Sequence, residues 1–135
     1  KIAILDSVPK FHWRDDNGIT DGQKFVDFGN KYIQTENLHF FNSIDKCLEE
    51  FNAIGRMRGV GWAVMYQDPS TGMISNHWVD MHETGHPSGF HPLLVMDLWE
   101  HAFSVDWTTN PAGRGKYIEA YLKNIDWATV AGRLS

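Results

Sequence analysis

Hydrophobic residues recur along this chain at two different spacings, and the change of spacing marks the elements that we expect. Residues 44–55 carry apolar side chains three or four positions apart, which predicts an amphipathic helix. Residues 62–66 and 73–79 are apolar runs separated by the turn sequence DPSTG, which predicts a β-hairpin. A third apolar run at 93–96 adds a strand, and helical spacing returns over residues 112–123. The pattern therefore predicts an α+β fold, in which helices flank a three-stranded antiparallel sheet.

The beginning of the chain has a different pattern. Residues 2–5 form a short apolar run that predicts a strand, residues 10–20 are rich in turn formers, and residues 21–28 predict a short helix. We therefore expect two parts, an atypical N-terminal segment at 1–41 and an α/β domain at 42–135.

Polar side chains with metal-binding chemistry follow the third predicted strand. Asp97 ends the apolar run, and Glu100 and His101 lie in a segment that we expect to be helical as far as residue 107. A carboxylate and an imidazole at the end of a rigid strand suit iron, manganese or zinc. The same spacing suits a plainer role, in which Asp97 caps the helix and His101 packs one turn further on. The spacing by itself leaves both interpretations open.

Three segments of the chain resemble one family. The string D-x-W-E-H-A resembles a signature of the C-terminal domain of iron/manganese superoxide dismutases, and its residues here are Asp97, Trp99, Glu100, His101 and Ala102. Residues 44–62 resemble that family's fDkFkeeF…GsGW helix and strand start, and residues 114–134 resemble its closing helices with the Y…N-x-x-W pattern. The resemblance covers roughly residues 42–134, about two thirds of the chain, in the family's order.

This resemblance implies a metal-dependent superoxide dismutase, which converts two superoxide anions into dioxygen and hydrogen peroxide with iron or manganese as cofactor. Asp97 and His101 would be metal ligands. His39, which precedes two phenylalanines as a ligand histidine of the family precedes aromatic residues, would be a third.

Other residues would have supporting roles in the same site. His82 would be the catalytic side chain that donates a hydrogen bond to solvent at the metal, and Trp62 and Trp99 would line the site. Glu100 would reach the ligand histidine of a second subunit across a two-fold axis, so the resemblance implies a homodimer.

The first 41 residues are too few to contain the family's helical hairpin at full length, because each helical residue adds only about 1.5 Å. Two protein ligands hold a metal weakly. A non-catalytic, metal-free scaffold or assembly module is therefore the alternative. The presence of His82, Asp97, Glu100 and His101 favours the enzyme, since a scaffold needs no such polar groups at a buried corner.

A second motif points to a different class of protein. The string HETGHPSGFH resembles H-E-x-x-H-x-x-G-x-x-H, the site of a zinc metalloprotease, through His82, Glu83, His86, Gly89 and His91. That site requires the first two histidines on one face of a helix. The strand-like residues before the string and the proline after its second histidine oppose a helix, so we expect a loop.

Composition limits the partners and the compartment. A chain of 135 residues that is 42% hydrophobic can bury one ordinary core. A net charge of −5 opposes nucleic acid or an anionic membrane as a main partner. The single Cys47 forms no internal disulfide, which fits a reducing compartment. Neither a membrane span nor a signal peptide is evident in the sequence, so we expect a cytoplasmic protein.

Overall fold

The computed structural model describes residues 44–134. Predictions about earlier residues fall outside this range. They are the strand at 2–5, the helix at 21–28, the boundary near residue 42 and the ligand role of His39.

The described residues contain the predicted sheet. Its strands are β1 (Trp62–Gln67), β2 (Ile74–Val79) and β3 (His91–Asp97). The strand order is β2-β1-β3, and both pairs are antiparallel. The turn between β1 and β2 is held by Asp68, whose carboxylate accepts hydrogen bonds from Ser70 and Thr71. The three-stranded antiparallel sheet expected from the sequence is therefore confirmed.

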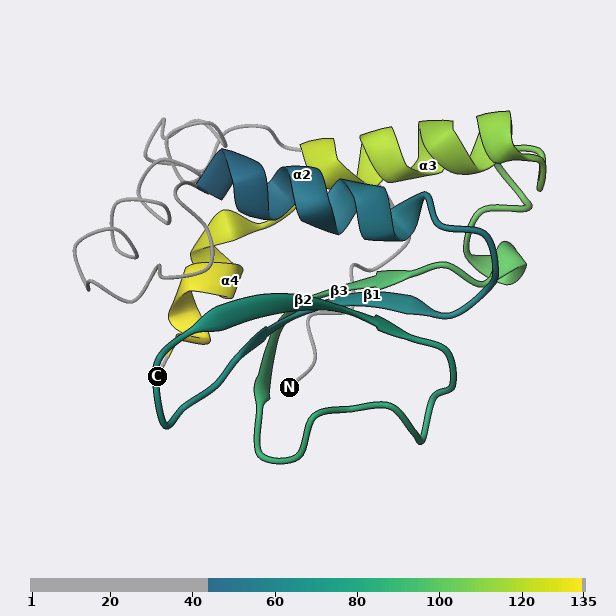
Figure 1. Ribbon diagram of the computed structural model, residues 1–135. Helices are drawn as coiled ribbons and strands as arrows, with labels where there is room; N and C mark the ends of the chain where they lie inside the picture. The colour runs from purple at the N-terminus through teal and green to yellow at the C-terminus, as the bar shows by residue number, and fades with distance from the viewer. Residues whose placement is uncertain (1–43, 135) are drawn as a thin grey trace, which may run out of the picture.

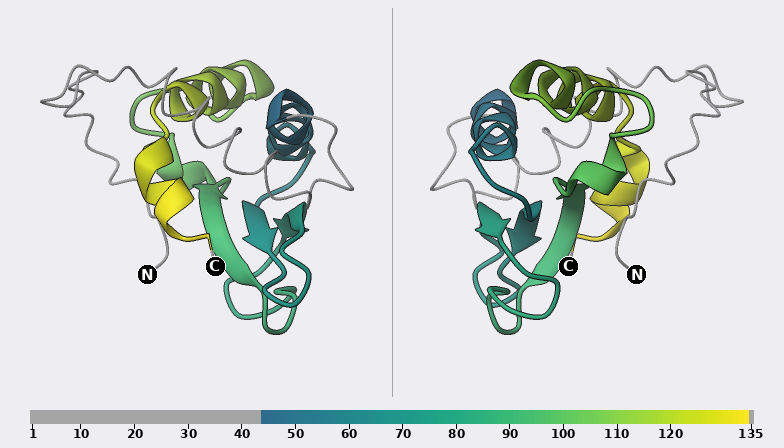
Figure 2. Two further views of the ribbon diagram at one scale, coloured as in Figure 1. Left: turned by 90° about the vertical axis from the view of Figure 1, so that its left-hand side faces the viewer. Right: turned by 90° about the vertical axis from the view of Figure 1, so that its right-hand side faces the viewer.

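Helices cover one face of this sheet. Helix α2 (Ile44–Gly55) and helix α3 (Pro111–Lys123) lie on the same side of it, and the shorter α4 (Trp127–Gly132) lies at one end (Figures 1 and 2). Helix α3 begins one residue before the predicted start, because Asn110 caps it by accepting the backbone N–H of Gly113 at 2.9 Å. None of the helices between residues 44 and 134 has the length and apolar character that crossing a membrane requires.

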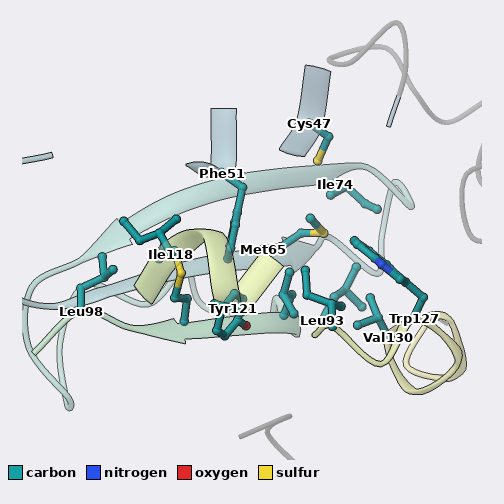
Figure 3. Close-up of a cluster of buried hydrophobic side chains, with 14 residues drawn as sticks. Cys47, Phe51, Met65, Ile74, Leu93, Leu98, Ile118, Tyr121, Trp127 and Val130 are labelled. Atoms are coloured by element: carbon teal, nitrogen blue, oxygen red, sulfur yellow. The ribbon is translucent and has the colours of Figure 1, made fainter. Parts of the chain in front are cut away.

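The main core lies between the sheet and the helices (Figure 3). Phe51 of α2, Met65 of β1 and Ile118 of α3 have no exposed surface. Strand β1 sends alternate side chains, Ala63 and Met65, into this layer, as the two-residue period of a strand requires. On β3 the adjacent Leu93 and Leu94 both enter it, where the pairing with β1 shifts register. The cluster consists of Cys47, Phe51, Ala63, Met65, Ile74, Leu93, Leu94, Met96, Leu98, Ile118, Tyr121, Ile125, Trp127 and Val130.

The prediction of a helix as far as residue 107 is wrong. The structure has only a single 3-10 turn, η1 (Glu100–Ala102), and the chain then continues in turns. Phe103 is buried, but the next three side chains are exposed, and Val105 is 91% exposed. A helix over these residues would pack mainly Phe103 and Trp107, which both contact Tyr117. So narrow an apolar face does little to stabilise a short helix, because packing of an apolar face is what stabilises most of them.

Candidate metal site

The site forms where the ends of all three strands meet. Trp62 at the start of β1 pairs with Asp97 on β3 and with Val79 on β2. The backbone N–H of Leu98 donates to the carbonyl of Gly61 at 2.8 Å, which extends the pairing by one residue. Gly61 has a φ of +140°, and a Cβ there would lie 2.4 Å from the carbonyl oxygen of Val79. The glycine is therefore required for the approach that places Trp62 beside Asp97.

Asp97 uses its two carboxylate oxygens differently. Its Oδ1 accepts the backbone N–H of Trp99 at 2.9 Å, which stabilises the turn after β3. Its Oδ2 lies 3.0 Å from Nε2 of His101. The N-cap of η1 is Trp99, which makes no side-chain cap bond. Asp97 therefore does not cap this turn, and the capping interpretation is wrong. One oxygen shapes the backbone, and the other faces the imidazole.

The chemistry of this pair fits iron or manganese, because both metals accept imidazole nitrogen and carboxylate oxygen. Two ligands that each lie about 2.1 Å from one metal ion, at about a right angle, are about 3.0 Å apart. The Asp97 side chain is 23% exposed and that of His101 is 69% exposed, so both are accessible. Within residues 44–134, no group of three or more His, Cys, Asp or Glu side chains could hold a metal. The pair therefore fits part of a metal site.

His82 lies between two indole rings at this end of the sheet. Its ring centroid is 5.4 Å from that of Trp62 and 5.2 Å from that of Trp99. The indole N–H of Trp62 donates to Nδ1 of His82 at 2.9 Å. An indole nitrogen can only donate, so Nδ1 is the acceptor and the neutral ring carries its proton on Nε2. His82 therefore presents an N–H donor at Nε2.

Tyr117 of α3 also belongs to the surroundings of the site. The helical spacing of residues 112–123 puts it on one stripe with Tyr121, and no motif marked it. Its ring stacks on Phe103 with centroids 5.2 Å apart. Burial, with a smaller contribution from the negative charge of Asp97, raises the pKa of Tyr117 above its ordinary value of 10.0. Tyr117 is thus a neutral phenol near the carboxylate. Nothing in the spacing of the sequence distinguished it from Tyr121, which lies on the same stripe.

The HETGHPSGFH segment forms no helix and no protease site. It connects β2 to β3 through bends and turns, with Gly85 and Gly89 at φ +86° and +79°. Both ring nitrogens of His86 make hydrogen bonds within the protein, one with Tyr66 and one with the backbone of His82. The comparison with the protease motif is also one residue short, since His91 follows Gly89 by two positions and the motif requires three. The zinc metalloprotease hypothesis is therefore wrong.

The structure brings most of the predicted site residues to one end of the sheet. These are Trp62, His82, Asp97, Trp99 and His101. Glu100 is exposed on η1, next to His101. His39 lies outside the described residues. The roles assigned to these side chains remain predictions, but their grouping is a property of the fold.

Comparison with known proteins shows which sequences this chain is similar to. Superoxide dismutase [Mn] of Haloarcula marismortui is 37% identical over 91 residues, which cover 67% of this chain and 43% of that protein. Superoxide dismutase [Fe] of Pyrobaculum aerophilum is 31% identical over 114 residues, 84% of this chain and 49% of that protein. The chain thus spans less than half the length of these relatives. Residues 30–133 match the family described as iron/manganese superoxide dismutases, C-terminal domain, and the chain belongs to that family.

Proposed function

We propose that this domain supplies Asp97 and His101 as two ligands of iron or manganese in a superoxide dismutase. The observation that carries the proposal is the 3.0 Å separation of Asp97 Oδ2 and His101 Nε2 at the end of a paired strand. Relatives named for manganese and for iron both match the chain, so either metal is compatible with this pair. When bound, the metal supplies the electron exchange by which one superoxide is oxidised to dioxygen and another is reduced to hydrogen peroxide.

The remaining ligands must come from outside residues 44–134, since the described residues offer no third donor to this pair. His39 is the candidate within this sequence, and a second chain or a further segment of a longer protein is the other source. Three or four protein ligands define a stable site, whereas two hold a metal weakly. The proposal therefore requires residues beyond the described domain.

His82 would act as a hydrogen-bond donor to the oxygen species that react in this site. Its Nε2–H is defined by the bond that Nδ1 accepts from Trp62, and the indoles of Trp62 and Trp99 restrict the ring. A donor already in position spares the reorganisation that a mobile group would require. Superoxide and peroxide oxygens are acceptors, which matches the N–H that His82 presents.

A homodimer is part of the proposal. Glu100 is exposed beside His101, so its carboxylate is available to a ligand histidine of a second subunit. A carboxylate that accepts the second ring N–H of a ligand histidine orients the ring and makes it a better ligand. A two-fold axis would create this contact twice.

Metal content tests the proposal directly. Protein purified without chelators is analysed by plasma mass spectrometry and assayed for superoxide dismutation, as wild type, as Asp97→Ala with His101→Ala, and as His91→Ala. His91 is an exposed histidine at the opposite end of β3, so the last variant is a matched control. We expect near-stoichiometric iron or manganese in the wild type and the control, and loss of metal and activity in the double variant.

Two results would contradict the proposal. Iron or manganese that stays bound in the double variant would show that Asp97 and His101 are not the ligands. A wild type without metal and without activity would favour the non-catalytic scaffold. Sedimentation velocity of the same wild-type sample tests the dimer, and a single species at the mass of one chain would exclude it.

A further inference from the structure

The segment between β2 and β3 makes a second contact with β1 that the proposed chemistry does not use. The hydroxyl of Tyr66 lies 2.6 Å from Nδ1 of His86, and Nε2 of His86 lies 2.9 Å from the backbone carbonyl oxygen of His82. A carbonyl oxygen only accepts, so Nε2 of His86 carries a proton. In the neutral ring Nδ1 is then the acceptor, and the Tyr66 hydroxyl donates to it.

The two contacts with β1 have matching spacing. Trp62 binds His82, and Tyr66 binds His86, so partners are 20 residues apart in both pairs. Trp62 and Tyr66 are four positions apart on one strand, which puts them on the same face, about 13 Å apart. The two histidines are also four positions apart. The H-x-x-x-H spacing that suggested a zinc site therefore matches two aromatic residues of β1.

Tyr66 is a rigid anchor for this arrangement, whereas His86 is a surface side chain. Tyr66 is only 3% exposed and packs in a buried cluster with Val64 and Val79 on the face of the sheet that α2 does not cover. Its raised pKa, caused by burial, keeps the hydroxyl protonated and able to donate. His86 is exposed in a segment without helix or strand (Figure 1). The bond to Tyr66 therefore ties an irregular segment to the sheet.

We propose that His86, anchored by Tyr66, is a positioning residue that holds His82 in the orientation in which Nε2–H is its free donor. His82 is then held at two points, its ring by Trp62 and its carbonyl by His86. Without the bond between His86 and the His82 carbonyl oxygen, only the bond between Trp62 and His82 Nδ1 remains. The backbone at His82 can then move, and the remaining bond is less well aligned. This inference rests on the proposed function only for its effect on catalysis, because the positioning itself does not require a metal.

Nuclear magnetic resonance of the metal-free protein tests the positioning without any activity. The readouts are the tautomer of His82, from ring nitrogen shifts, and the hydrogen exchange rate of the Trp62 indole N–H. The wild type should show one tautomer, protonated on Nε2, and a protected indole. His86→Leu should mix the tautomers and speed indole exchange by about tenfold, the effect of losing one hydrogen bond.

Three further variants separate positioning from a general disturbance of the segment. His86→Gln keeps an amide that can donate to the carbonyl and accept from Tyr66, so it should restore both wild-type readouts. Tyr66→Phe removes only the hydroxyl, and it should have no further effect in a chain that already has His86→Leu. Thr84→Ala changes an exposed side chain of the same segment and should change neither readout. A His86→Leu protein with an unchanged tautomer and unchanged exchange would overturn the inference.

Activity of the metal-loaded protein tests the consequence for catalysis. His86→Leu should lower kcat about tenfold at unchanged metal content, and His86→Gln should recover most of it. A wild type without metal or activity rejects the proposed function, while the magnetic resonance readouts still decide whether His86 positions His82. An active wild type whose kcat and His82 tautomer are both insensitive to His86→Leu rejects the positioning role alone.

Discussion

In the core beneath the helices, Phe51, Met65 and Ile118 have no exposed surface, whereas at the polar end of the sheet the His101 side chain is 69% exposed. The core consists almost entirely of apolar groups packed between α2, α3 and the sheet. The polar end consists of a carboxylate, imidazoles and indoles joined by hydrogen bonds. Burial of the first group stabilises the fold, and accessibility of the second group is what the proposed reaction with superoxide requires.

The two regions nevertheless share the same strands. On β1, Ala63 and Met65 point into the main core, while Trp62 and Tyr66 lie on the opposite face with the site residues. Alternation along a strand makes this division possible, because neighbouring side chains point to opposite faces. Packing in the core thus holds the strands that carry the site rigid, although the core contributes no reactive group to the site. Substitutions should separate the two regions, and three of them follow in order of expected effect.

Phe51→Ala should have the largest effect on stability. It removes a fully buried ring from the core, and we expect a loss of about 3–5 kcal/mol in the free energy of unfolding. Urea unfolding measures it, with Val105→Ala as the control at a side chain that is 91% exposed. Molecules that remain folded should keep the Trp62–His82 hydrogen bond. Loss of that bond in the folded population would show that the two regions are not separable.

Alkaline pH should weaken the core through Cys47. Burial, with a smaller contribution from the charge of Glu50, raises the pKa of the Cys47 thiol from 9.0 to about 12, although a hydrogen bond with Asn76 opposes the shift. The folded pKa is the higher one, so this contribution to stability is complete below pH 9 and is lost as pH rises from 9 towards 12. Between pH 8 and pH 10 the unfolding free energy should fall by about 1.4 kcal/mol from this group.

Cys47→Ala isolates the contribution of the thiol. The variant loses some packing at every pH, so the comparison is between the two pH values within each protein. Its decrease from pH 8 to pH 10 should be smaller than that of the wild type by about 1.4 kcal/mol. Equal decreases in both proteins would mean that the thiol ionises as readily in the folded state as in the unfolded state.

His101→Ala should have the smallest effect on the stability of the metal-free protein. Its bond to Asp97 joins an exposed imidazole to a partly exposed carboxylate, and such pairs contribute little. We expect a change within about 0.5 kcal/mol in urea unfolding without metal. A loss as large as that of Phe51→Ala would place the site within the stabilising core and remove the distinction between the regions.

Several features were predictable because their signals are local. The three strands, α2, α3 and the pair Asp97 and His101 followed from spacing, turn residues and a short motif within one stretch of chain. The prediction of a helix as far as residue 107 was wrong, because the three residues after Phe103 are exposed and contribute no apolar face to pack. The role of Tyr66 was not visible, since a buried aromatic residue on a strand has the same pattern whether or not its hydroxyl binds another segment.

The sequence by itself thus determined the elements of this domain and the residue types of its candidate site. Tertiary structure decided which histidine meets which partner within residues 44–134. His82 and His86 are four positions apart in a sequence that resembles a zinc motif, but they bind Trp62 and Tyr66 of β1. Both pairs join residues 20 positions apart. The antiparallel pairing of β1 with β2 brings the chain back beside β1, and Gly85 and Gly89 have positive φ in the segment that follows β2. Hydrophobic periodicity describes one segment at a time, so contacts between distant segments are decided only when the chain is folded.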